Sequence, residues 1–291
     1  MRAQLPGGER YAEIKRNLRE RGLATVCEEA QCPNIGECWN EGTATLMLMG
    51  EECTRACRFC AVRHNGKPAA LDADEPQHAA EQVALMALRY VVMTSVNRDE
   101  LVDGGAAHLR ACIEAVRARN PDTLVEVLMP DFQGVEADIA TVVAGQPHVF
   151  AHNIETVERL SDSVRDRRAS FAQSLRVLAA AKAAAARNNQ SMLTKSSIMV
   201  GLGESSEEVV AALAALRTVG CDAVTLGQYL RPSPWHHEVV RFVTPEEFAA
   251  WKATAESMGF RYAASGPLVR SSYRAGEFYL SALITEAAGP R

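Results

Sequence analysis

Residues 53–60 read Cys-Thr-Arg-Ala-Cys-Arg-Phe-Cys and follow an apolar, strand-like stretch at residues 44–49. This CxxxCxxC spacing allows the thiols of Cys53, Cys57 and Cys60 to lie on one face of a small loop. Three thiols can bind one metal centre and leave its fourth position to another ligand. The stretch therefore predicts a metal-binding loop at the end of a first strand.

A second set of three cysteines lies just upstream, at Cys27, Cys32 and Cys38. Six of the eight cysteines therefore fall within one short region of the chain. Pro33 directly follows Cys32, and a glycine follows soon after, which is the pattern of a turn. We expect this second set to lie on irregular backbone.

The composition is that of an ordinary globular protein: the 291 residues are 47% hydrophobic and 23% charged. The net charge of −5 gives no reason to expect nucleic acid, whose binding needs a concentrated basic surface. The N-terminal residues lack the apolar core of a signal peptide, and no stretch has the roughly 18 apolar residues that span a bilayer. We therefore expect a cytoplasmic, monomeric protein without a nucleic-acid or membrane partner.

Clustered cysteines in a reducing cytosol indicate metal binding or catalysis, because disulfides are rare there. A structural zinc site closes with four Cys or His ligands, and Cys53, Cys57 and Cys60 have no obvious fourth. His64 is near, but the spacing is not that of a zinc finger. An iron–sulfur cubane held by three thiolates has one iron left to bind a substrate or cofactor. We therefore favour an iron–sulfur cluster over zinc.

From residue 44 onward, apolar stretches alternate with helical segments. The apolar stretches are nearly continuous, which is typical of parallel strands buried on both faces. The six strands expected are residues 44–49, 90–96, 124–129, 149–154, 197–202 and 223–229.

Six βα units with right-handed crossovers fit either an open doubly wound sheet or a partial TIM-like barrel. In both folds the site lies at the carboxyl ends of the strands. We divide the chain into an N-terminal extension at residues 1–43, the βα units at 44–260 and a C-terminal extension at 261–291.

The cysteine loop, with Phe59 before its last cysteine, resembles the CxxxCxFC signature of radical S-adenosylmethionine enzymes. The resemblance implies a partial (β/α)6 barrel in which Cys53, Cys57 and Cys60 ligate a [4Fe–4S] cluster. The open iron of that cluster would chelate S-adenosylmethionine, and the reduced cluster would cleave it to a 5′-deoxyadenosyl radical. Such chemistry belongs to the cofactor, while the protein supplies binding and orientation.

Further segments resemble lipoyl synthases, and the likeness extends from about residue 22 to 275. In addition to the cysteine pattern CxxxxCxxxxxC from Cys27 to Cys38, the matching segments are residues 42–45, 89–92, 200–204, 226–230 and the RSSY sequence at 270–273.

In lipoyl synthases the first cysteine set holds an auxiliary [4Fe–4S] cluster whose fourth ligand is a serine of the RSSY sequence. The resemblance thus implies Cys27, Cys32, Cys38 and Ser272 as ligands, with Ser272 preferred to Ser271. These ligands would draw both extensions over the barrel mouth. Oxygen is harder than thiolate and suits the cluster less well, so this iron should be the easiest to release when the cluster donates sulfur.

The implied reaction inserts two sulfur atoms at carbons six and eight of an octanoyl chain bound to a lysine. The implied substrates are octanoylated lipoyl-domain proteins, namely acyltransferase subunits of 2-oxoacid dehydrogenases and the glycine-cleavage H protein. An electron donor and a carrier that repairs the auxiliary cluster are further implied partners.

Polar residues and glycines at the strand ends are candidates for holding S-adenosylmethionine, although such residues are also common as turn formers and caps. We expect Asn153 and Glu155 to bind the ribose hydroxyls, and Arg165 or Lys195 to pair with the carboxylate. Thr94 and Asn97 are candidates for the amino group, and Gly201 and Gly203 would let the backbone approach adenine closely. The full candidate set is Thr94, Asn97, Asn153, Glu155, Arg165, Lys195, Gly201 and Gly203.

Other chemistry-bearing residues have structural interpretations. Cys112 lies in a helical pattern and Cys221 lies just before a strand. We interpret both as buried free thiols. His236-His237 lies in an irregular loop and lacks a partner ligand. Residues 103–105, Asp-Gly-Gly, indicate a turn rather than a phosphate loop.

Three other classes compete with this interpretation. A methylthiotransferase would carry a separate N-terminal cysteine domain and an RNA-binding module, which this sequence lacks. An iron–sulfur scaffold or electron carrier has little use for a six-unit βα array. A zinc-stapled structural protein is distinguished by metal analysis.

Overall fold

The computed structural model describes residues 12, 15–16, 24–25, 35–40 and 43–272. Its centre is an eight-stranded sheet in the order β1-β2-β5-β6-β7-β8-β9-β10. β1 runs antiparallel to β2, and every other neighbouring pair is parallel. The strands of this sheet are β1 (Ala24–Thr25), β2 (Thr43–Leu48), β5 (Tyr90–Ser95), β6 (Leu124–Leu128), β7 (Val149–Ala151), β8 (Leu193–Val200), β9 (Ala223–Gln228) and β10 (Tyr262–Gly266).

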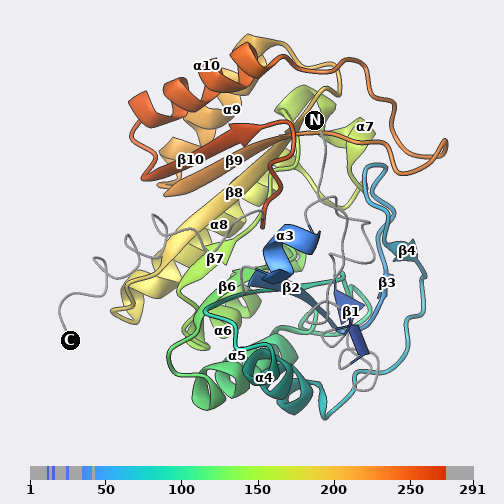
Figure 1. Ribbon diagram of the computed structural model, residues 1–291, viewed down its shortest axis with the longest axis vertical. Coiled ribbons are helices and arrows are strands. Elements are labelled where there is room, and N and C mark those ends of the chain that lie inside the picture. The colour runs from blue at the N-terminus through green and yellow to red at the C-terminus, as the bar shows by residue number, and fades with distance from the viewer. Residues whose placement is uncertain (1–11, 13–14, 17–23, 26–34, 41–42, 273–291) are drawn as a thin grey trace.

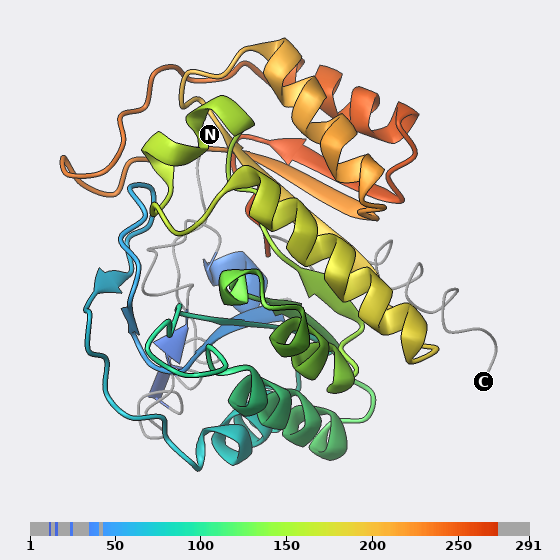
Figure 2. The ribbon, with the colours of Figure 1, turned by 180° about the vertical axis from the view of Figure 1, so that it is seen from behind.

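Helices cover the outer face of this curved sheet (Figures 1 and 2). The main helices are α4 (Glu75–Leu85), α5 (Ala106–Arg119), α6 (Glu136–Ala144), α8 (Phe171–Arg187), α9 (Ser206–Thr218) and α10 (Pro245–Ser257). Shorter elements are α3 (Ile35–Asn40), α7 (Ser161–Val164), the 3-10 turns η1 (Phe132–Gly134) and η2 (Glu158–Leu160), and a small two-stranded sheet of β3 (Glu52–Cys53) and β4 (Arg63–His64).

The predicted partial barrel is confirmed, and all six expected strands are present. The strand expected at residues 197–202 begins earlier, at Leu193. β10 was not predicted, because its sequence YAASG is poor in the β-branched and aromatic residues that favour strands. Pairing with β9 makes it a strand, and it begins the expected C-terminal extension. Among the described strands, β1 and β10 form the two edges, so the barrel is open.

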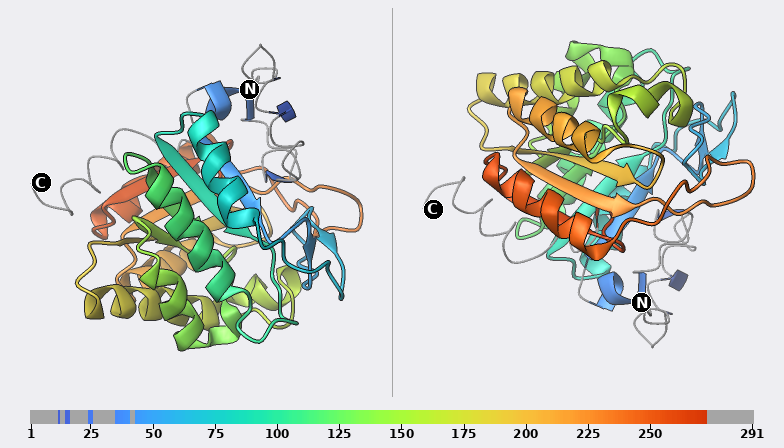
Figure 3. Two further views of the ribbon diagram at one scale, coloured as in Figure 1. Left: turned by 90° about the horizontal axis from the view of Figure 1, so that it is seen from below. Right: turned by 90° about the horizontal axis from the view of Figure 1, so that it is seen from above.

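The helices lie beside the sheet in both views of Figure 3. The hydrophobic core fills the space between the sheet and these helices. Under α4, α5 and α6 it contains Met93 and Ile113, and under α9 and α10 it contains Leu226 and Trp251. Trp39 of α3 is fully buried in the first of these clusters. In the described part of the chain, no helix has the length and apolar character needed to cross a membrane.

Capping contacts explain where several helices begin. Ser205 and Thr244 form capping boxes with Glu208 and Glu247, each pair satisfying two free backbone N–H groups. Ser170 accepts a hydrogen bond from the Gln173 N–H at the start of α8. Each of these residues follows a strand or loop on the carboxyl side of the sheet, so the caps help to shape the loops around the site.

Candidate active site

The loop that carries Cys53, Cys57 and Cys60 leaves the carboxyl end of β2, as predicted. The three cysteines are half-buried. Backbone hydrogen bonds fix the loop from two sides, because the Arg58 N–H donates to the Val164 carbonyl at 2.9 Å and the His237 N–H donates to the Arg58 carbonyl at 2.7 Å. The loop is therefore held between α7 and the segment that follows β9.

Backbone N–H groups point at two of the thiols. The Asn97 N–H donates to Cys53 Sγ at 3.3 Å, and the Asp166 N–H donates to Cys57 Sγ at 3.3 Å. Burial raises the pKa of Cys57 to about 11 and that of Cys60 to about 12. A metal centre bound here would therefore have to displace protons from the thiols, and the N–H donors would stabilise the resulting thiolates.

The donor set of the loop fits a cluster. The charges of Cys53 and Cys57 both raise the pKa of Cys60, so the three thiols lie within electrostatic reach of one another. Each thiolate of a cubane binds a different iron, and N–H donors to the sulfur atoms tune such a cluster. Three neighbouring thiols with backbone N–H donors therefore fit a [4Fe–4S] cluster.

A buried ion network braces the cysteine loop. The Arg55 guanidinium donates to both oxygens of Asp99 at 2.7 and 2.8 Å, and to Asp131 at 2.6 Å. Burial opposes charge on Asp131, but the bond from Arg55 holds the pKa of this carboxyl below its usual value. Asp99 follows β5 and Asp131 follows β6, so the network ties the cysteine loop to two neighbouring strand ends.

A second ion pair extends this network to the segment after α7. The Arg168 guanidinium pairs with Asp166 at 2.8 Å and donates to the Thr54 carbonyl at 2.7 Å. The hydrogen bond from Arg168 strongly lowers the pKa of Asp166. Asp166 also accepts from the Ala56 N–H at 3.0 Å, so its side chain and its own N–H both hold the cysteine loop.

Glu155 lies close to this loop in a strained backbone conformation. Its φ of 67° is left-handed, and hydrogen bonds between its backbone and β8 hold it there. Burial raises the pKa of Glu155, while charge from Arg165 and a hydrogen bond from Asn153 oppose the rise. The charge of Glu155 in turn raises the pKa of both Cys57 and Cys60. Strain beside titratable groups is typical of functional sites.

Asn153 has an unused acceptor. Its Oδ1 is buried and has no hydrogen-bonding partner among the described residues. A buried polar atom without a partner is costly, and it is common where a ligand supplies the missing group. Asn153 and Glu155, which the sequence analysis paired, therefore lie together beside the cysteine loop.

Arg165 also lies at this site, within a chain of hydrogen bonds. Its Nη1 donates to Ser174 Oγ at 2.9 Å, and Ser174 Oγ lies 2.8 Å from His152 Nε2. His152 Nδ1 lies 2.8 Å from the Met129 carbonyl, so Nδ1 carries the proton and Nε2 accepts from the serine. Burial lowers the pKa of His152 to about 4, so the imidazole is neutral at pH 7.

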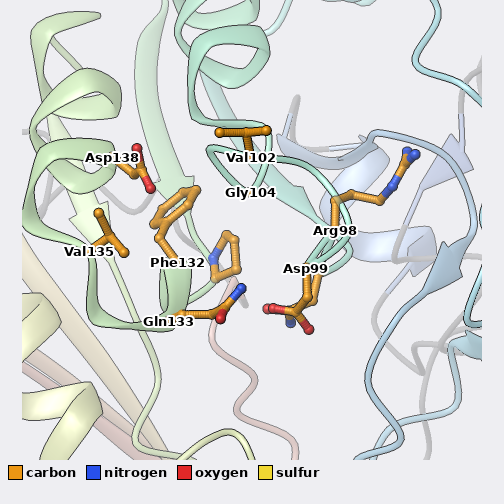
Figure 4. A pocket seen from close by; sticks show the side chains of 10 residues that line it. Arg98, Asp99, Val102, Gly104, Phe132, Gln133, Val135 and Asp138 are labelled. Atoms are coloured by element: carbon orange, nitrogen blue, oxygen red, sulfur yellow. The ribbon is translucent and has the colours of Figure 1, made fainter.

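Thr94 and Asn97 lie at the end of β5. The Thr94 hydroxyl donates to the Leu128 carbonyl at 2.8 Å, and the Asn97 carbonyl accepts from Thr54. A pocket of about 150 Å³ opens beside them, between the loops after β5 and β6 (Figure 4). Asn97, Asp99 and Gln133 line it, and the cysteines do not. The pocket therefore borders the site without containing it.

Lys195 is not placed where the sequence analysis expected it. Its ammonium donates to both oxygens of Glu126 at 2.9 and 3.0 Å, and Tyr90 donates to the same carboxylate at 2.7 Å. The ion pair is almost fully buried. Because β8 begins at Leu193, Lys195 lies toward the amino end of its strand, away from the carboxyl ends, and its ammonium is bound by Glu126. Its assignment to the carboxylate of S-adenosylmethionine is corrected accordingly.

Gly201 and Gly203 have protein neighbours. A Cβ on Gly201 would lie 2.2 Å from Gln228 Nε2 and 2.6 Å from the Arg241 carbonyl, and a Cβ on Gly203 would meet Val240 at 3.5 Å. The missing side chain of Gly201 therefore makes room for the segment that follows β9. The sequence analysis assigned this room to adenine.

The proposed auxiliary site is only partly described. Cys27 and Cys32 lie outside the described residues, and Cys38 lies in α3, which packs against β2. Ser272 is half-buried at the end of the described chain, as is Ser271. The segment that leads to them crosses β9 closely, because a Cβ on Gly227 would lie 2.1 Å from the Val269 carbonyl.

The ion network around the cysteine loop was not predicted from the sequence as part of the site. Its members share one signal, which is that each charged residue stands in or directly after a loop at a strand end. The residues missed are Arg55, Asp99, Asp131, Asp166 and Arg168.

Comparison with known proteins gives a consistent result. The model of the radical SAM superfamily matches residues 47–216. A lipoyl synthase of Myxococcus xanthus is 56% identical over 284 residues, which are 98% of this chain and 94% of that protein. The apicoplast lipoyl synthase of Toxoplasma gondii is 54% identical over 278 residues, covering 96% of this chain and 50% of its own length.

Solved structures share the fold at low sequence identity. The peptide-bound SuiB of Streptococcus suis has a TM-score of 0.57 at 9% identity over 88% of this chain, which spans only 53% of SuiB. The hydrogenase maturase HydG of Carboxydothermus hydrogenoformans has a TM-score of 0.56 at 11% identity, covering 93% of this chain and 82% of HydG.

The superfamily match over more than half of the chain and the high identity over nearly all of it agree with the cysteine loop and the open barrel. The chain belongs to the lipoyl synthase family of radical S-adenosylmethionine enzymes.

Proposed function

We propose that this chain inserts two sulfur atoms, at carbons six and eight, into an octanoyl chain bound to a lysine of a lipoyl-domain protein. Family membership makes it a radical S-adenosylmethionine sulfurtransferase that uses a [4Fe–4S] cluster. The observation that carries the proposal is the meeting of Cys53, Cys57 and Cys60 with Asn153 and Glu155 at the carboxyl side of the sheet.

Cys53, Cys57 and Cys60 would hold the radical-generating cluster. When bound and reduced, that cluster supplies the electron that cleaves S-adenosylmethionine to a primary carbon radical, which can break unactivated C–H bonds. The chain's own part is to orient and shield. The N–H groups of Asn97 and Asp166 stabilise the thiolates, and the Arg55 network holds the loop against the strand ends.

The remaining strand-end residues would hold S-adenosylmethionine. Asn153 Oδ1, which has no protein partner within the described residues, is suited to accept a hydrogen bond from a ribose hydroxyl. Glu155 beside it would accept a second. Arg165 remains the candidate for the carboxylate, and Thr94 and Asn97 remain candidates for the amino group.

A second [4Fe–4S] cluster would be held by Cys27, Cys32, Cys38 and Ser272 and would donate the sulfur. Two features of the described chain support this assignment. α3 packs against β2, the strand that leads to the cysteine loop, and the segment before Ser272 crosses β9 at Gly227. Both extensions, residues 1–43 and 261–291, would thereby close over the mouth of the barrel.

The implied protein substrates are octanoylated lipoyl domains, both the acyltransferase subunits of 2-oxoacid dehydrogenases and the glycine-cleavage H protein. We further propose that a monomer acts in the cytoplasm, with a separate electron donor and a carrier that rebuilds the auxiliary cluster.

The two cluster roles are separated by two variants. Anaerobic reconstitution should yield about eight irons per chain. Cys53→Ala should abolish S-adenosylmethionine cleavage, whereas Cys27→Ala should keep cleavage and lose sulfur insertion. Cys221→Ala, at a buried thiol just before the amino end of β9, is the matched control and should keep both. Identical behaviour of the Cys53 and Cys27 variants would refute the division of roles.

A further inference from the structure

The chain enters the cysteine loop through two residues in the left-handed conformation. Met49 follows the last residue of β2 with a φ of 64°, and Gly50 has a φ of 89°. The conformation is ordinary for glycine and costly for methionine, so surrounding contacts must enforce it. Cys53 follows only a few residues later, and the geometry of this turn sets the direction in which the loop leaves the sheet.

Side chains bind both polar groups of the Met49 backbone. Its N–H donates to Glu75 Oε1 and Oε2, each at 3.0 Å, and its carbonyl accepts from Arg98 Nη1 at 3.1 Å. Met49 is 3% exposed, so water cannot replace these partners. The strained residue is therefore held by a carboxylate on one side and a guanidinium on the other.

The carboxylate of Glu75 is itself held in place. Glu75 is the first residue of α4, and its Oε2 lies 2.6 Å from Nε2 of His108, which lies on α5. Both side chains are almost buried, with exposed fractions of 10% and 12%. Two neighbouring helices thus contribute one fixed acceptor to the end of β2.

The start of α5 is also shaped to receive Met49. A Cβ on Gly105 would lie 2.2 Å from Met49 Sδ, and Gly105 has a φ of 87°. Asp103 stabilises the turn, because its carboxylate accepts from the N–H groups of Gly105 and Ala107, each at 2.9 Å. The Asp-Gly-Gly sequence therefore has a specific role, because the missing side chain of Gly105 leaves room for the side chain of Met49.

We propose that Glu75, oriented by His108, is a positioning residue for the radical-generating cluster, acting through the Met49 amide on the approach of the loop to Cys53. The inference rests on the proposed function, because it takes Cys53, Cys57 and Cys60 as the ligands of that cluster. In this role Glu75 acts through the Met49 N–H and not through a contact with substrate or cofactor. Its effect is to fix the backbone from which the first ligand is presented.

The same side chains could instead bind a metal ion, since a ligand atom of each of Glu75, His108 and Cys112 lies within 4.8 Å of the others. Both oxygens of Glu75 are already engaged by the Met49 N–H, and this favours positioning. Metal analysis of the purified protein separates the two roles. If the wild type holds one zinc per chain and Cys112→Ala loses it, the proposal is overturned. If the wild type holds no zinc and the activity of Cys112→Ala is unchanged, the proposal is supported.

The direct test compares Glu75→Ala and Glu75→Gln with the full-length wild type, and uses Glu81→Ala on the same helix as the control. In cluster-free protein, hydrogen exchange in a peptide covering residues 47–60 should be about tenfold faster or more in Glu75→Ala, as expected for loss of a bond to a charged group. Glu75→Gln keeps one acceptor oxygen and should show a smaller increase.

In reconstituted and reduced protein, Glu75→Ala should weaken the change that S-adenosylmethionine causes in the EPR spectrum, and should lower kcat for its cleavage more than it raises KM. If both Glu75 variants show the same hydrogen-exchange rates and the same EPR response as the wild type, the proposal is overturned. If Glu75→Ala fails to fold, Glu75→Gln and His108→Gln decide it on the same measurements. A wild type without any EPR response overturns the proposed function as well, whereas altered Glu75 variants beside a responsive wild type support both.

Discussion

The guanidinium of Arg55 binds both carboxylate oxygens of Asp99, at 2.7 and 2.8 Å, from inside the cysteine loop. Arg55 stands between Cys53 and Cys57, and Asp99 follows the neighbouring strand β5. This bidentate pair is geometrically specific in a way that a lysine could not reproduce. The pair therefore fixes the cysteine loop against the carboxyl end of β5.

Asp99→Asn should strongly destabilise the cluster-free protein. The substitution leaves the buried Arg55 with one carboxylate in place of two, and breaking a buried ion pair costs about 3 kcal/mol or more. Urea denaturation measures the loss. The matched control is Glu51→Gln, which removes the exposed pair with Arg63 and should cost less than about 1 kcal/mol. Equal losses in the two variants would show that the network does not brace the loop.

Asn153→Ala should raise the KM for S-adenosylmethionine by about tenfold, because it removes an acceptor that has no protein partner within the described chain. The kcat should change less, since Asn153 is expected to bind the ribose and not the reacting sulfonium. The measurement is the rate of methionine release against S-adenosylmethionine concentration. Asn188→Ala, on the exposed end of α8, should match the wild type; an unchanged KM in Asn153→Ala would remove this residue from the binding site.

Gly227→Ala should impair sulfur insertion while S-adenosylmethionine cleavage persists. A Cβ at this position would lie 2.1 Å from the Val269 carbonyl and would push away the segment that leads to Ser272. The two activities can be measured on the same sample as methionine and as sulfur-containing product. Gly66→Ala is the control, because a Cβ there meets nothing within 4 Å. If both activities are lost together, Gly227 is needed for the stability of the barrel as a whole and not specifically for the path of the segment to Ser272.

The stability of the cluster-free protein should fall as the pH is lowered from about 6.5 to about 4. Burial lowers the pKa of His152 to about 4, below the value near 6.5 expected in the unfolded chain. The unfolded state therefore takes up the proton first, and His152 contributes up to about 3 kcal/mol that is present above pH 6.5 and lost toward pH 4. His152→Gln should flatten this part of the profile, and His64→Gln, at an exposed position, should not.

Much of the fold was predictable because buried parallel strands are continuous apolar stretches, which make β2, β5, β6, β7 and β9 visible from their residues alone. β8 was placed four residues late because it begins with Leu193, Thr194 and the charged Lys195. Only the partner explains a charge inside the sheet, and Glu126 lies far away in the sequence. In the same way, β10 forms a strand because it pairs with β9, and this pairing is not visible in its own sequence.

The site was predictable where spacing encodes chemistry and not where it depends on folding. The CxxxCxxC spacing locates the cysteine loop, and the strand end locates Asn153 and Glu155. The bonds from Arg55 to Asp99 and Asp131 join residues that only the barrel brings together. The lack of a side chain at Gly201 makes room for Gln228 of β9, and this contact too is visible only in the folded chain.

The central claim is that this chain converts a lysine-bound octanoyl group to lipoyl. Mass analysis of an octanoyl-lysine peptide incubated with reconstituted protein, S-adenosylmethionine and a reductant tests it most directly. The account predicts a product that carries two sulfur atoms, formed with two equivalents of S-adenosylmethionine cleaved per peptide. Cleavage of S-adenosylmethionine with no sulfur in the peptide, by protein shown to hold both clusters, would contradict it.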